Sequence, residues 1–245
     1  MMQNDTPRLT LYSEAVYLVA LLMLSLSVAL LTAADFGVSM IVAPAYLISK
    51  KVGFLTFGQS EYVIQGILFV VFCLCMRKVK AVYFASFATG LIYGAVLDGW
   101  RSLVPLFNES VTPVGSMPMG ERLLMFGVGV PLCSLSIALF FHVYLYPQVY
   151  DFFVKGVSAR YHLDRTRFKR LFDGSFFLLS CVLTLLLFRS FVGVGWGTVV
   201  MTLVNGVIIG WFDRLLTRYV RVVPLFPKAA AAFELEDASE AGRTE

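Results

Sequence analysis

Residues 14–34 have the sequence EAVYLVALLMLSLSVALLTAA, an apolar run whose length decides the fold class of this chain. A helix that crosses the hydrocarbon core of a bilayer needs about 20 mostly apolar residues. The apolar core of a secretory signal peptide is shorter, about 7–15 residues, and follows a basic segment. Here Arg8 is offset by Asp5 and Glu14, so the preceding segment is not basic. We therefore predict that this run is a first membrane-spanning helix.

The composition of the whole chain agrees with a membrane protein. Of its 245 residues, 58% are apolar and only 15% are charged, whereas a soluble domain has about 45–50% apolar and about 25% charged residues. This balance excludes an ordinary cytosolic enzyme, a disordered protein and a secreted disulfide scaffold. The formal net charge of +4 bears on orientation in the membrane, and no nucleic-acid partner is expected.

Five later stretches also have the apolar character of spanning helices, so the sequence predicts an all-α protein with six transmembrane helices. They cover residues 62–76, 81–104, 122–144, 174–188 and 195–216. The segment Met40–Ile48, within residues 35–57, is too short to span and is either interfacial or re-entrant. Residues 147–173 form an amphipathic cytoplasmic segment, for which we weigh a helix on the membrane surface against a helix packed on the bundle.

The two halves of the chain resemble each other. SLSVAL at residues 25–30 recurs as SLSIAL at 134–139, and the Thr89-Gly90, Gly94, Asp98 series recurs as Asn205-Gly206, Gly210, Asp213. A three-helix unit that is repeated must enter the membrane from opposite sides, because three is an odd number. We therefore predict two inverted three-helix repeats, the form of many secondary transporters. The two glycine pairs are expected to allow close helix packing.

The predicted domain organisation follows from the internal repeat and from the proline and glycine residues that interrupt the helices. Its parts are a cytoplasmic N-terminus (1–13), a first repeat (14–108) containing the segment 35–57, an external Pro- and Gly-rich loop (109–120), a second repeat (121–223) containing the segment 147–173, and a disordered cytoplasmic tail (224–245).

The basic residues predict which side of the membrane is cytoplasmic. Six spans place both termini on one side, and three quarters of the 20 Lys and Arg residues fall there. The other side has only Lys50, Lys51, Arg101, Arg122 and Arg189. Because Lys and Arg are retained preferentially in the cytoplasm, we expect both the N-terminus and the C-terminus to be cytoplasmic.

Neutral polar residues are expected near the middle of the bundle. Gln65, Thr89 and Asn205 lie within predicted spans, and Thr89 and Asn205 are equivalent in the repeat. Gln65 and Asn205 cannot easily be satisfied in lipid and should face protein or a cavity. We predict that these three residues bind a small neutral or weakly polar solute, and that Asp35 orients the substrate or a gate at the outer mouth.

The acidic residues are expected near helix ends, which predicts a midplane without acid, base or metal ligand. Three of them fall toward the outer side, namely Asp35, Glu61 and Asp98. Asp98 is expected to pair with Arg101, and Asp213 with Arg214 or Arg218. Asp35 follows a helix C-terminus, where the dipole disfavours a carboxylate, so it needs Lys50 or Lys51, a backbone N–H or a substrate cation.

Signatures of catalysis and metal binding are absent from the sequence. It contains no H-E-x-x-H, no G-x-S-x-G and no phosphate-binding loop. Cys73, Cys75, Cys133 and Cys181 lie in apolar runs without ligand spacing, and His142 has no acidic residue close in sequence. We expect no enzyme activity, no catalytic residue, no metal and no cofactor.

Short motifs link the chain to a known type of membrane protein. ADFGVS at residues 34–39, followed by LTFG at 55–58, resembles the AD-x-G-V-S and L-S-F-G pattern of YczE/YitT-like bacterial membrane proteins. GWGT at 195–198, followed by Asn205-Gly206, is similar to their G-x-G-T stretch. Met40 stands where proline is common, and Tyr144–Pro147 replaces the Asp-x-Gly turn in the second half. The resemblance implies an uncharacterised multi-spanning protein of the bacterial plasma membrane.

The function predicted from these features is a permease that binds a small solute between the repeats and moves it by alternating access. Two alternatives are a substrate-binding subunit of a larger transporter and a non-transporting structural or regulatory membrane protein. The expected partners are the lipid bilayer, the solute, and either a second copy of the chain or an energising subunit.

Overall fold

The computed structural model describes residues 9–227 and Ala230, apart from residues 78, 80, 114, 146 and 147. Within this part the chain is helical, as expected, with one small sheet. The elements are β1 (Leu9–Tyr12), α1 (Ser13–Ala34), α2 (Ala43–Val52), α3 (Phe57–Met76), α4 (Ala81–Leu103), the 3₁₀ helix η1 (Pro105–Phe107), α5 (Met119–Phe140), α6 (Val149–Arg160), α7 (Arg165–Phe188), α8 (Trp196–Tyr219) and β2 (Val220–Val223).

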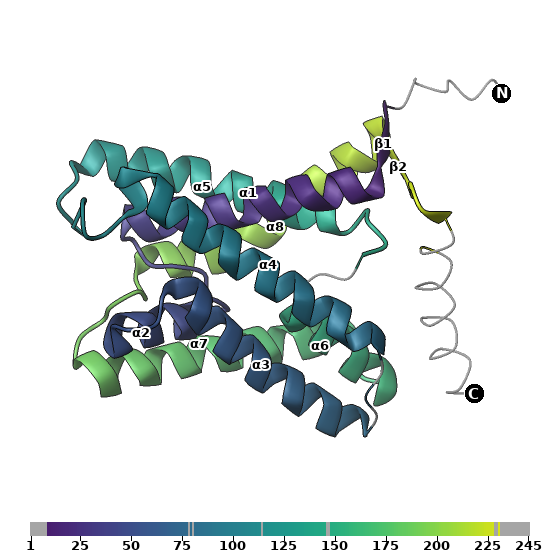
Figure 1. The fold of residues 1–245 in the computed structure, drawn as a ribbon, viewed down its shortest axis with the longest axis horizontal. Helices are drawn as coiled ribbons and strands as arrows, with labels where there is room; N and C mark the ends of the chain where they lie inside the picture. The colour runs from purple at the N-terminus through teal and green to yellow at the C-terminus, as the bar shows by residue number, and fades with distance from the viewer. Residues whose placement is uncertain are drawn as a thin grey trace.

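Five helices of the described chain are long and apolar enough to cross a membrane. They are α1, α3, α5, the Arg167–Phe188 part of α7, and α8. Five such helices support a protein embedded in a membrane. The fourth helix, α4, has 23 residues and runs the length of the bundle (Figure 1), but it is not among these five.

The long helices lie roughly along one axis, in two groups connected by α4 (Figure 1). In the first group α1 packs on α5, and α5 packs on α8. In the second group α2 and α6 both pack on α3 and α7, while α4 contacts both α1 and α3. Because α8 has α5 as its main neighbour, few of its residues are buried.

The bundle has two distinct ends. The α2 end holds the C-termini of α1, α4 and α7 and the N-termini of α3, α5 and α8, and Arg122 at the start of α5 donates to the Ala34 carbonyl at the end of α1. The α6 end holds the opposite termini (Figure 1). There Tyr144 donates to Glu14, 2.7 Å away.

The five basic residues expected on the outer side all lie at the α2 end, on or next to the ends of α2, α4, α5 and α7. Of the more numerous basic residues expected on the other side, Arg8, Lys78, Lys80, Lys228 and Arg243 lie outside the described residues. The others belong to elements at the α6 end.

The two short helices run alongside long helices of the opposite half. Ser180 of α7 donates to the Met40 carbonyl just before α2, and Lys51 near the end of α2 donates to the Leu187 carbonyl, 3.0 Å away. Thus α2 starts beside the interior of α7 and runs along it toward the C-terminus of α7.

Helix α6 has the same relation to α3. Tyr150 at its start reaches Glu61, and Tyr161 just after its end donates to the Cys75 carbonyl, 2.9 Å away. Most of its residues are buried, including Phe152 and Phe153. This packing favours the helix packed on the bundle over the surface helix.

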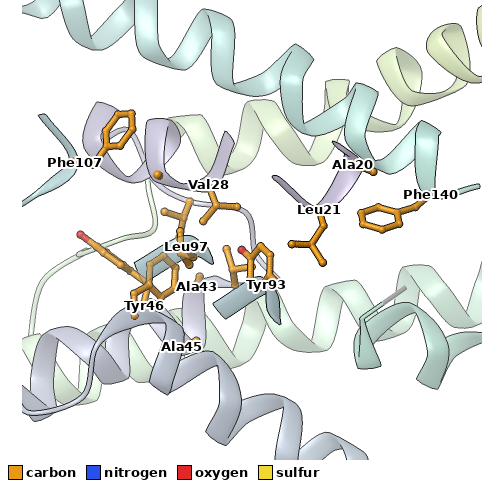
Figure 2. Packing of buried hydrophobic residues seen from close by; sticks show 14 of the residues in the cluster. Ala20, Leu21, Val28, Ala43, Ala45, Tyr46, Tyr93, Leu97, Phe107 and Phe140 are labelled. Carbon is orange, nitrogen blue, oxygen red and sulfur yellow. The ribbon is translucent and has the colours of Figure 1, made fainter. Parts of the chain in front are cut away.

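Small and aromatic side chains fill the core between the groups (Figure 2). Tyr93 and Leu97 of α4 belong to one buried cluster with Ala43 and Tyr46 of α2 and Val28 of α1. A second cluster at the α6 end contains several of the phenylalanines of α3, α6 and α7. Part of the abundant Phe content is therefore core packing between helices.

The strands β1 and β2 form a parallel pair that was not expected from the sequence. Leu9 is paired with Val220 and Tyr12 with Val223. The pairing joins the segment before α1 to the segment after α8 (Figure 1). Residues 1–8 and 231–245, which include most of the predicted tail, lie outside the described residues.

Candidate functional site

The N-terminus of α3 is fixed firmly against α4, and this positions the candidate site one turn further on. Thr56 caps α3 in a reciprocal capping box with Gln59. Asp98 of α4 accepts from the Gly58 N–H at 2.8 Å and from the Thr56 hydroxyl at 2.5 Å. A methyl group added to Gly58 would lie 2.1 Å from the Gly94 carbonyl oxygen, so the two backbones touch.

Glu61, in the second turn of α3, is completely buried, with 0% exposure. Its Oε2 atom accepts from the Tyr150 hydroxyl of α6 at 2.9 Å and from the Gln65 Nε2 atom at 3.2 Å. In the described chain its Oε1 atom has no hydrogen-bond partner, and no Lys, Arg or His pairs with the carboxyl group.

Two further polar atoms close to Glu61 are also unsatisfied. Gln65 Oε1 and the Tyr93 hydroxyl of α4 are buried and lack partners among the described residues. Gln65 lies against Gly90, because a methyl group added there would be 2.0 Å from Gln65 Oε1. Buried polar groups are nearly always hydrogen-bonded, so this group of four residues (Glu61, Gln65, Tyr93 and Tyr150, the Glu61 cluster) requires an explanation.

The remaining unsatisfied atom is the hydroxyl of Ser60, next to Glu61. Together these atoms are the only buried side-chain oxygens or nitrogens without a partner in the ranges that the structure describes. All four are oxygens, and all belong to α3 or α4. The unsatisfied buried polar side-chain atoms of the described interior therefore all belong to the α3–α4 pair.

The four predicted site residues do not come together. Gln65 is part of the Glu61 cluster. Thr89, although adjacent to Gly90, points to α1, where its hydroxyl lies 2.6 Å from the Tyr17 hydroxyl. Asn205 of α8 accepts from Ser134 of α5 at 2.5 Å, so it belongs to a different helix contact.

Asp35 lies at the α2 end, away from the cluster. Arg122 donates to the Asp35 carbonyl at 2.8 Å and to its carboxylate at 3.2 Å, and the guanidinium lies over the Phe36 ring. Desolvation raises the pKa of Asp35, and the charge of Arg122 offsets only part of this rise. The partner is thus Arg122, which was not among those expected.

Other acidic residues also have different partners from those expected. Asp98 caps α3, while Arg101 pairs with Glu109 at 2.6 Å. Asp213 lies 3.0 Å from His142 Nε2. The partners of Asp98 and Asp213 are 40 and 71 residues away in the sequence, which is why local spacing did not identify them.

Glu61 lies near the N-terminal end of α3, as expected, but its side chain is completely buried in the bundle, which was not anticipated. The sequence signal was available: Glu61 and Gln65 are four residues apart, so they share one face of an apolar helix. The sequence could not have predicted Tyr150 as a neighbour of these two residues, since its position depends on how α6 folds back along α3. In the described chain no group of three His, Cys, Asp or Glu residues could hold a metal ion.

Comparison with known proteins identifies the family. No curated protein and no solved structure matches the chain. A family model described as a family of unknown function, DUF6198, matches residues 11–214. This range contains every spanning helix except the last turn of α8, both short helices and the whole Glu61 cluster. An uncharacterised family is what the sequence resemblance implied, and the chain belongs to DUF6198.

Proposed function

We propose that the protein is a membrane permease for a small polar solute, and that the solute binds at the Glu61 cluster. The observation that carries this proposal is a fully buried carboxyl group surrounded by unsatisfied polar oxygens. Ionisable residues inside membrane segments are costly and usually mark a substrate or ion pathway. A solute that donates hydrogen bonds would satisfy Glu61 Oε1 and Gln65 Oε1, and one that accepts would satisfy Tyr93.

The short helices support this proposal. Both α2 and α6 start beside the interior of a long helix, and discontinuous helices of this kind form the substrate sites of many transporters. Tyr150 is the second residue of α6 and contacts Glu61 directly. A shift of α6 along α3 would therefore change the site.

Helix contacts also support two inverted repeats. When helices α1 to α4 are matched in order with helices α5 to α8, the contact between α1 and α4 corresponds to the contact between α5 and α8. In the same way, the contact between α2 and α7 corresponds to the contact between α6 and α3. The matching SLSVAL and SLSIAL motifs belong to the antiparallel α1–α5 pair, in which Ser136 donates to the Ala20 carbonyl and Gly129 packs on Leu31. We propose that α4 is a sixth spanning helix, since it is only one residue shorter than α8 and connects the same two ends.

The orientation proposed from the charge distribution places the α2 end outside and the α6 end in the cytoplasm of a bacterial cell. The sparse basic residues of the α2 end support it. We also propose kinship with YczE/YitT-like proteins from the motifs quoted above.

Transport is tested with the purified chain in proteoliposomes. A panel of small amides, amines, alcohols and amino acids is first screened for stabilisation of the protein against heat, and the hits are assayed for uptake in radiolabelled form. We expect Gln65→Leu and Tyr93→Phe to reduce uptake at least tenfold while the folded protein remains in the membrane. Tyr219→Phe, on an exposed part of α8, is the matched control. Uptake that is unchanged in both cluster variants would refute the assignment.

A second candidate function, as a subunit of a larger assembly, is favoured by the exposed face of α8. Methyl groups added to Gly206 or Gly210 would meet no atom within 4 Å, whereas their counterparts Gly90 and Gly94 hold α3. Uptake by liposomes that contain this chain alone would exclude the need for an energising subunit.

A further inference from the structure

We infer that Glu61 carries a proton on its Oε1 atom in this closed arrangement and releases it when the site opens, so that solute movement is coupled to protons. This inference rests on the proposed permease function for its purpose, but the proton site itself rests on the geometry of the Glu61 cluster.

The charge surroundings of Glu61 favour the neutral acid. The titratable groups that face it are Tyr93 from α4 and Tyr150 from α6, and both are neutral under ordinary conditions. Phe176 of α7 packs against Tyr150 and brings no charge. Among the described residues Glu61 is the only fully buried acidic or basic side chain, and none of them places a cation beside it that would stabilise a carboxylate.

The hydrogen bonds lead to the same result by a separate argument. An ionised carboxylate and an amide oxygen are both acceptors only, which is how Glu61 Oε1 and Gln65 Oε1 both remain unsatisfied. The Gln65 amide nitrogen already donates to the other carboxyl oxygen, Oε2. A carboxylic acid and a carboxamide can pair in both directions, so one proton on Oε1 converts an acceptor into a donor for the free amide oxygen.

A metal ion in place of the proton fits less well. The cluster supplies a single carboxyl group, and hard divalent cations prefer several charged oxygen ligands. A single proton is enough to neutralise the one negative charge that this carboxyl group can carry. On opening, the acid transfers its proton to water, which becomes hydronium, and the remaining carboxylate keeps its bonds from Tyr150 and Gln65.

Infrared spectroscopy of the purified full-length protein tests the proton site without knowledge of the solute. At neutral pH the wild type should show the carbonyl stretching band of a protonated, buried carboxylic acid. Glu61→Gln should lack this band, and Gln65→Leu should shift it because the bond to the amide is lost. Glu121→Gln, in the first turn of α5, is the control and should retain the band. Equal gel-filtration profiles establish that each variant is folded.

Absence of the band in the wild type, or an unchanged band in Glu61→Gln, would overturn the inference. Coupling is then measured in proteoliposomes containing a pH-sensitive dye, with a solute identified by the uptake screen. A carboxylic acid band without solute uptake would support the proton site and contradict the permease function. Solute uptake that does not depend on an imposed pH gradient would support the permease function and contradict the coupling to protons.

Discussion

Replacement of Gly94 by alanine tests the close contact between α3 and α4. The added methyl carbon would lie 2.3 Å from Tyr62 Cε1 and 2.9 Å from the Gly58 carbonyl oxygen. Ordinary contacts of a methyl group begin near 3.4 Å. The Tyr62 ring must therefore move by about 1 Å and the α3 backbone by about 0.5 Å, which separates α3 from α4 next to the Glu61 cluster.

The expected cost follows from two opposing effects. Overpacking of this kind costs about 1–3 kcal/mol, while replacing glycine by alanine in a helix contributes up to about 1 kcal/mol in the opposite sense. The net loss of stability is about 1–2 kcal/mol. For a chain of this size that lowers the melting temperature by about 2–8 °C, at about 2–4 °C per kcal/mol.

The repeat supplies a matched control in Gly210→Ala. The same methyl group on α8 would meet no atom within 4 Å, so only the helix-propensity gain remains and the melting temperature should stay level or rise slightly. Both variants are compared by thermal unfolding of the detergent-solubilised protein, followed through tryptophan fluorescence. Equal melting temperatures for Gly94→Ala and Gly210→Ala would refute the packing argument and the exposed position of the α8 glycine face.

Two further predictions concern the contacts that surround the site. Arg122→Ala should lower stability by about 2–3 kcal/mol, because three hydrogen bonds to Ala34 and Asp35 are lost and bonds from a charged donor contribute about 1.5–3 kcal/mol in well-buried cases. Asp35→Asn should cost less in the same melting assay, since the two bonds to backbone carbonyls remain. For the Ser134–Asn205 pair, the Ser134→Ala and Asn205→Leu variants should show a coupling of about 0.5–1.5 kcal/mol in a double-mutant cycle, and additive losses would contradict the hydrogen bond.

The spanning helices could largely be predicted because apolar length is a local property. The last helix, expected at 195–216, is found at Trp196–Tyr219. The starts of α3 and α7 were placed too late, since hydropathy misses polar first turns. In α3 the Thr56 capping box supports such a turn. In α7 the Asp164 side chain accepts from the Arg167 N–H at 2.7 Å.

The site could be predicted only in part, because it depends on contacts between distant segments. Gln65 was identified from its polarity within an apolar run. Glu61 lies one turn earlier on the same helix, whereas Tyr93 and Tyr150 come from α4 and α6, and the position of Tyr150 requires α6 to fold back between α3 and α7. The partner of Asp35 was missed for the same reason, since Arg122 is 87 residues away in the sequence.

The contrast between two carboxyl groups on the same helix pair argues that the incomplete bonding of Glu61 has a function. Asp98 lies at the α3–α4 contact, and each of its oxygens accepts a hydrogen bond, one from Gly58 and one from Thr56. That is how a carboxylate with a structural role is satisfied in this fold. Glu61 is more deeply buried, yet one of its oxygens accepts two bonds and the other accepts none from the described residues. A buried group with unused bonding capacity destabilises the fold, so its presence is explained best by a ligand or proton that uses that capacity during the working cycle.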